Sequence, residues 1–156
     1  MMTSQNNEIK VIEYLQNKIF NSSPEELQLK SLRKLKSSST FSLAPNGAGL
    51  QVEQLMDFVL EWHHFQKIVE KANQLGGIMY RGDDIVMNSG RLGIEVSHDC
   101  MEGFIASELL DLEDGISITR RSTYYSGILA WAGIVSLNKS EGNGSYITVN
   151  QEFRNI

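Results

Sequence analysis

The stretch Gln74-Leu75-Gly76-Gly77-Ile78-Met79-Tyr80 marks a change of pattern along the chain. Before the paired glycines, apolar residues recur at the three- and four-residue spacing of amphipathic helices. After them, short runs rich in β-branched and aromatic residues are separated by glycine-containing turns. Two consecutive glycines also favour the left-handed backbone that ends many helices. The sequence therefore predicts an α+β fold in which residues 1–156 form a single domain.

Helices are predicted on the N-terminal side of the glycines. Apolar spacing indicates a helix over residues 8–20, and the motif Ser23-Pro24-Glu25-Glu26 has the cap, proline and glutamate of a second helix start. We interpret residues 1–37 as a helical hairpin. The Ser-, Gly- and Pro-containing segment 38–50 is interpreted as a linker. A long central helix is then predicted over residues 51–75.

The C-terminal side is predicted to be mainly an antiparallel β-sheet, which together with the central helix forms the core over residues 51–156. Turn residues separate three short strands, and a helix is expected to begin at Asp99. Residues 124–137 fit a strand by composition and a buried helix by spacing; we prefer the strand. The expected strands are 78–80, 85–87, 92–96, 124–137 and, by clean alternation, 145–153.

Composition excludes several classes of protein. The chain has 156 residues, 41% of them hydrophobic, so it can bury a core without metals or disulfides. Its net charge of -5 disfavours general nucleic-acid binding. Cys100 is its only cysteine, which fits a reducing compartment. There is no apolar run of membrane-spanning length and no signal-peptide pattern, so we expect a cytoplasmic protein, with a non-cleaved export route as the alternative.

The sequence Ser97-His98-Asp99-Cys100 offers a possible nucleophile. A cysteine in the first turn of a helix is stabilised as a thiolate by the unpaired amides and the helix dipole. His98 would act as a base, and Glu95 would orient it. The competing interpretation, which we prefer, is a small buried thiol beside a surface histidine. A small-molecule pocket between Trp62 and Tyr124 or Trp131 is a further possibility. We prefer the interpretation that these aromatic side chains fill the core, as they usually do.

The sequence Glu61-Trp62-His63-His64 is a possible metal site. Adjacent histidines on a helix point about 100° apart, whereas helical zinc ligands usually follow an i, i+4 spacing. Glu61 and His64 are three residues apart and could share one face of the helix. Together with His98 and Cys100 they could in principle build a zinc site. Because the usual spacing is missing, we expect no metal and no cofactor.

A cluster of basic residues is the strongest candidate for contact with a partner: Lys30, Arg33, Lys34 and Lys36. In an otherwise acidic chain, this cluster could dock an acidic protein or an anionic membrane surface. Since catalytic motifs are missing, the sequence favours a non-enzymatic protein-interaction module: a small regulator, a chaperone-like factor or an immunity-type inhibitor. A homodimer formed through the long helix or a sheet edge is also expected.

Overall fold

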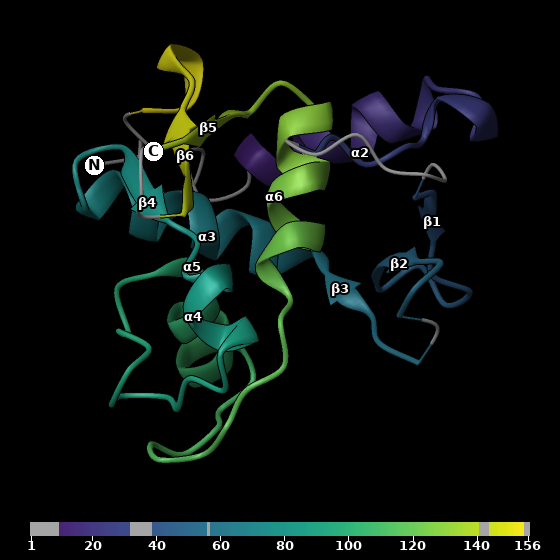
Figure 1. Cartoon of the computed structure of the whole chain (residues 1–156). Coiled ribbons are helices and arrows are strands. Elements are labelled where there is room, and N and C mark those ends of the chain that lie inside the picture. The colour runs from purple at the N-terminus through teal and green to yellow at the C-terminus, as the bar shows by residue number, and fades with distance from the viewer. Residues whose placement is uncertain (1–9, 32–38, 56, 141–143, 155–156) are drawn as a thin grey trace, which may run out of the picture.

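The computed structural model describes residues 10–31, 39–55, 57–140 and 144–154. Its α+β class is as predicted, with helices packed against two small antiparallel sheets (Figure 1). In this view α6 runs through the middle, the strands β1, β2 and β3 lie to its right, and β4, β5 and β6 lie at upper left.

The N-terminal hairpin is only partly confirmed. Helix α2 (Lys10–Phe20) forms as predicted and buries Val11, Leu15 and Ile19. The capping box at Ser23 also forms, but it opens only a single 3-10 turn, η1 (Pro24–Glu26). The chain then becomes extended because Gln28 forms a β-bridge with Thr40. The expected second helix is therefore wrong up to residue 31, and the rest of it lies outside the described residues.

The prediction of a linker followed by one long helix is also corrected. Strands β1 (Phe41–Leu43), β2 (Gly49–Val52) and β3 (Leu60–Glu61) form an antiparallel sheet in the order β1-β2-β3. This sheet lies within the expected linker and the N-terminal part of the expected helix, as far as residue 61. Helix α3 (Trp62–Gln74) begins only at the end of β3. The apolar spacing misled because it contains no information on the pairing of β2 with β1 and β3.

The paired glycines end α3 as predicted. Gly76 and Gly77 have φ angles of 93° and 90°, and the Gly77 amide donates to the Ala72 carbonyl at 2.8 Å. This left-handed turn leads directly into β4 (Ile78–Tyr80). Strand β4 pairs with the C-terminal strand β6 (Ser145–Val149), so the turn fixes α3 against the second sheet.

Residues 82–121 form a helical and looped region in place of two expected strands. Residues 85–87 lie in helix α4 (Asp83–Met87), and residues 92–96 form a turn closed by the Leu92–Val96 bridge. Helix α5 (Met101–Phe104) continues into the π-helical turn η2 (Ile105–Leu109), close to the helix predicted here. Gly103 is required at this point because a Cβ would collide with the Ser97 carbonyl oxygen.

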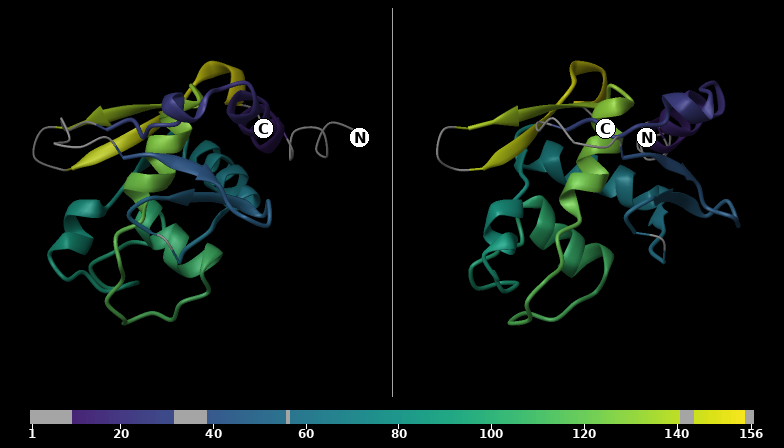
Figure 2. Two further views of the ribbon diagram at one scale, coloured as in Figure 1. Left: turned by 90° about the vertical axis from the view of Figure 1, so that its right-hand side faces the viewer. Right: turned by 45° about the vertical axis from the view of Figure 1, so that its right-hand side comes forward.

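The preferred strand at 124–137 is wrong in its first part, and the helical alternative is correct. Helix α6 (Ser122–Trp131) buries Tyr125, Ile128 and Leu129, and its C-terminal end is followed by Gly133 at φ 78°. Strand β5 (Val135–Lys139) then pairs with β6, which gives the second sheet the order β4-β6-β5. The short 3-10 turn η3 (Gln151–Phe153) follows β6. Figure 2 shows the β5–β6 hairpin projecting beside α6.

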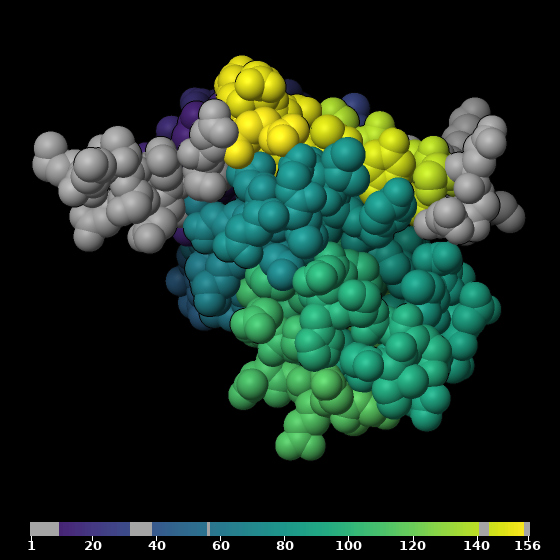
Figure 3. Space-filling model, turned by 90° about the vertical axis from the view of Figure 1, so that its left-hand side faces the viewer, coloured from purple at the N-terminus to yellow at the C-terminus, as the bar shows by residue number. Residues whose placement is uncertain are grey.

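One hydrophobic core joins the two ends of the chain. It includes Val11 from α2, Leu50 from β2, Phe65 from α3, Ile128 from α6 and Phe153 from η3. Figure 3 shows the C-terminal segment, in yellow, lying against the teal residues of the middle of the chain. A smaller cluster around Val86, Leu92 and Cys100 forms a second core in the region of α4 and α5. Among the described helices, none combines the length and apolar character needed to cross a bilayer.

Candidate functional site

The environment of Cys100 is that of a protonated thiol. Cys100 is the N-cap of α5; its sulfur donates to the Ser97 carbonyl at 3.1 Å and accepts from the Gly103 amide at 3.5 Å. Burial raises the pKa of this thiol above its ordinary value. The amide contact lowers the pKa, as expected at a helix start, but the effect of burial is larger. The thiolate that nucleophilic catalysis needs is therefore disfavoured here.

The other two predicted catalytic residues are engaged elsewhere. His98 Nε2 lies 2.7 Å from Asp114 Oδ1. Glu95 accepts two hydrogen bonds from the Arg91 guanidinium, at 2.8 and 3.0 Å, and these bonds hold its pKa at about 2. His98, Glu95 and Cys100 thus have three separate sets of partners.

The indole groups of the proposed small-molecule pocket are also engaged. Trp62 Nε1 donates to the Gly47 carbonyl at 2.9 Å, and Trp131 Nε1 donates to the Glu26 carbonyl at 2.8 Å. The Trp131 ring packs edge-to-face on Phe41. The Trp62 bond connects α3 to the turn between β1 and β2, and the Trp131 bond connects α6 to the N-terminal segment.

Of the basic cluster, only Lys30 falls within the described residues. It is exposed, and its backbone amide donates to the Gly127 carbonyl of α6 at 3.3 Å. Arg33, Lys34 and Lys36 lie outside the described residues. The role of the cluster therefore stays a prediction from the sequence.

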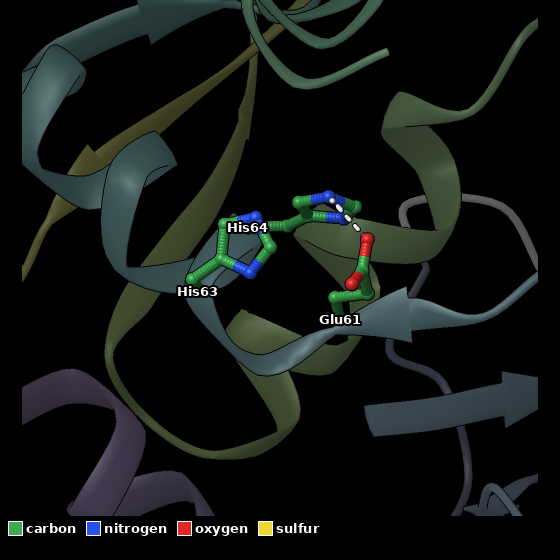
Figure 4. A group of neighbouring side chains, drawn as sticks. All are labelled: Glu61, His63 and His64. Atoms are coloured by element: carbon green, nitrogen blue, oxygen red, sulfur yellow. Dashed lines mark ion pairs between the residues drawn. The ribbon is translucent and has the colours of Figure 1, made fainter. Parts of the chain in front are cut away.

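A group of potential metal ligands lies where β3 passes into α3. Glu61 is the N-cap of α3, with extended backbone angles (φ -70°, ψ 148°), and His63 and His64 belong to the first turn. Potential ligand atoms of all three residues lie within 4.8 Å of one another. Figure 4 shows the His64 ring between the His63 ring and the Glu61 carboxylate. His98 and Cys100, expected from the sequence to join Glu61 and His64, belong to the separate contacts described above.

His64 is the buried member of this group. Its side chain is 1% exposed, its Nδ1 lies 2.8 Å from the Tyr125 hydroxyl, and its Nε2 lies 3.2 Å from Glu61 Oε2. The second contact lacks hydrogen-bond geometry, which leaves Nε2 buried without a hydrogen-bond partner. Burial, reinforced by His63, lowers the pKa of His64 to about 4, so the ring is neutral near pH 7.

The outer face of the second sheet is a separate, uncharged surface. On β4, Ile78 and Tyr80 are 45% and 50% exposed, and the Tyr80 ring packs on Tyr146 of β6 with centroids 5.4 Å apart. Next to them, Asn138 Nδ2 of β5 donates to Thr148 Oγ1 at 3.0 Å. The face thus comprises Ile78, Tyr80, Ser136, Asn138, Tyr146 and Thr148. Sequence reasoning missed this surface, although the alternation in residues 78–80 and 145–149 was its signal.

Comparisons with known proteins give no relative from which a role for these residues could be transferred: no family model, curated protein or solved structure matches the chain.

Proposed function

We propose that this protein is a protein-interaction module that binds another protein through the outer face of its β4-β6-β5 sheet. The observation that carries the proposal is the uncharged exposed face formed by Ile78, Tyr80, Tyr146 and their hydroxyl and amide neighbours. Interface cores are depleted in charged residues and enriched in tyrosine, which matches this composition.

The arrangement of the aromatic side chains suits an interaction hot spot. Tyr80 and Tyr146 come from adjacent strands in register, and their rings hold each other in place. Rings that are already ordered lose little conformational entropy when a partner covers them. Exposed Ile78 extends the apolar part of the surface along β4.

Strand β4 adds a second means of binding. It lies at one end of the sheet, since within the described part of the chain it pairs with β6 and with no other strand. A partner strand placed beside β4 would form backbone hydrogen bonds and would cover Ile78 and Tyr80 at the same time. A second copy of this chain could pair in the same way, so a homodimer is a specific outcome of the test below.

The surroundings of α6 support a protein partner over a nucleic acid. In helix-turn-helix proteins the second helix lies in the DNA groove. Helix α6 follows the helical segment α5–η2, but it contains no lysine or arginine. A Cβ at Gly127 would lie 2.8 Å from the Lys30 carbonyl oxygen, so the N-terminal segment packs closely on this helix. Although Arg121 is its N-cap, α6 itself carries no cationic side chain that could contact phosphate groups along the helix.

The experiment is site-specific photo-crosslinking in the native cells. A photoreactive phenylalanine replaces Tyr80 in one variant, Tyr146 in a second and Phe20 in a control. Phe20 is an aromatic residue of α2 that is 63% exposed. We expect a discrete adduct with another protein from positions 80 and 146, and none from position 20.

Tyr80→Ser, checked for folding by circular dichroism, should then weaken binding of the identified partner about 30-fold, the effect of losing a hot spot of about 2 kcal/mol. An adduct of twice the monomer mass would show that the partner is a second copy of this chain and not a different protein. Equal adducts from all three positions, or none from 80 and 146, would overturn the proposal.

A further inference from the structure

We propose that Glu61, His63 and His64 form a binding site for a divalent transition-metal ion, with zinc as the reference ion. The site is independent of the sheet surface, because it lies at the junction of β3 and α3. It also replaces the sequence expectation that adjacent histidines cannot serve one metal.

The side-chain positions explain why that expectation does not apply. His63 and His64 are both helical residues of α3, yet their rings pack edge to face with centroids 4.5 Å apart, and Glu61 precedes the helix with an extended backbone. The three side chains therefore converge (Figure 4). Two atoms are already spaced for coordination: His64 Nε2 and Glu61 Oε2 are 3.2 Å apart. Ligands of a tetrahedral zinc ion with bonds near 2.0–2.1 Å are separated by about 3.3 Å.

Tyr125 supplies the outer contact that a metal-binding histidine needs. When the His64 Nδ1 proton is donated to the Tyr125 hydroxyl, 2.8 Å away, the lone pair of Nε2 faces Glu61. This assignment explains why a nitrogen atom buried to this degree has no hydrogen-bond partner: its role is to bind a cation.

The site is open on one side. Glu61 and His63 are exposed, so an ion can enter, and three protein ligands leave one position for water or an external ligand. Nitrogen and carboxylate donors suit zinc better than magnesium or calcium, which prefer sites built from oxygen atoms. Lys67, whose positive charge acts on His64, opposes metal binding.

The test is titration of the EDTA-treated full chain with zinc by calorimetry, and with cobalt by visible absorption. We expect one ion per chain and the intense bands of four-coordinate cobalt. Glu61→Gln and His63→Asn change exposed residues, so they should leave the fold intact and weaken zinc binding at least tenfold each. His98→Asn is the matched control, because His98 is also exposed and lies beside a carboxylate.

Two further variants distinguish a specific effect on metal binding from a general effect on the fold. Lys67→Gln should tighten zinc binding, since it removes a neighbouring positive charge. Tyr125→Phe should weaken zinc binding about 10- to 100-fold through the loss of the outer contact. The proposal is overturned by the absence of binding, by unchanged affinity in Glu61→Gln and His63→Asn, or by an equal loss in His98→Asn.

Discussion

The side chains of His64 and Tyr125, 61 residues apart in the sequence, share a buried hydrogen bond of 2.8 Å between Nδ1 and the phenolic oxygen. The bond joins α3 to α6, and the Tyr125 ring also packs on Phe65 with centroids 5.3 Å apart. The contact therefore serves both the core and the proposed metal site.

Tyr125→Phe should lower the free energy of unfolding of the metal-free protein by about 1–2 kcal/mol. The ring packing is kept, but His64 loses the partner of a buried polar atom. Urea unfolding in EDTA measures the change. Tyr14→Phe is the control, because that ring is partly exposed on α2, and its effect should stay within about 0.5 kcal/mol. Equal effects of the two substitutions would contradict the role given to the bond.

Alkylation should show that Cys100 is an unreactive thiol in the folded protein. Burial raises its pKa, so iodoacetamide should react fastest at a higher pH than it does with the chain unfolded in urea. The measurement is the rate of mass increase against pH in both states. Rapid reaction of the folded protein at pH 7 would instead revive the alternative of a cysteine-dependent enzyme.

Gly103→Ala should destabilise the protein by about 2 kcal/mol or more. This is the opposite of what helix propensity predicts, since alanine is more favourable than glycine in a helix by about 1 kcal/mol. The reason is the close approach of the Ser97 carbonyl to this position. Gly115→Ala is the matched control: its φ is 93°, but no atom lies within 4 Å of an added Cβ. The control therefore measures the effect of backbone strain without a clash. The Gly103→Ala variant should unfold at a lower urea concentration than the Gly115→Ala variant.

Buried Glu102 should make stability depend on pH. Its carboxylate accepts from the Arg121 amide at 2.9 Å and from Ser122 Oγ at 2.7 Å, at the start of α6. Burial nevertheless raises its pKa. The folded protein thus holds the proton to higher pH than the unfolded chain. The contribution of protonated Glu102 to the free energy of unfolding is therefore fully present below the pKa of the unfolded state. It is lost as the pH rises through the pKa of the folded state.

Glu102→Gln removes this titration, so the variant should gain stability relative to the native protein as the pH rises from 4 to 8. Urea unfolding at several pH values measures the difference. A difference that stays constant, or that changes in the opposite direction, would show that the burial of Glu102 does not control its protonation.

The basic cluster can be tested with the partner identified by crosslinking. Replacement of Lys30, Arg33 and Lys34 together by alanine should weaken binding while the circular dichroism spectrum stays unchanged, and the loss should shrink as salt is added. Unchanged affinity in a pull-down would show that the basic cluster does not contribute to binding of the partner.

The parts of the fold that were predictable are those in which local sequence and distant pairing agree. Gly76 and Gly77 have φ angles that suit glycine, and β4 and β6 alternate as sheet strands do. Residues 124–137 were ambiguous because their aromatic and β-branched residues satisfy strand composition and helical spacing together. The position of Gly133, which follows α6 and precedes β5, resolves the ambiguity only once the helix is known.

The candidate sites were less predictable for the same reason. The sequence pattern placed Glu61 and His64 on one face and excluded His63, because adjacent helical residues point about 100° apart. The contact between the two histidine rings depends on side-chain conformation, which the pattern does not specify. The pattern also contained no sign that Tyr125 would contact His64, since that contact depends on how α6 packs on α3. In the same way, the pairing of Tyr80 with Tyr146 follows from a strand register that neither segment specifies by itself.

The order β4-β6-β5 also has a consequence for synthesis on the ribosome. Strand β4 pairs with β6 but not with β5, so Ile78 and Tyr80 have no partner strand until residues 145–149 have been synthesised. At about 5–20 residues per second, the nascent chain displays this strand for several seconds. During that interval it can be recognised by a chaperone, or it can associate with another unfinished chain.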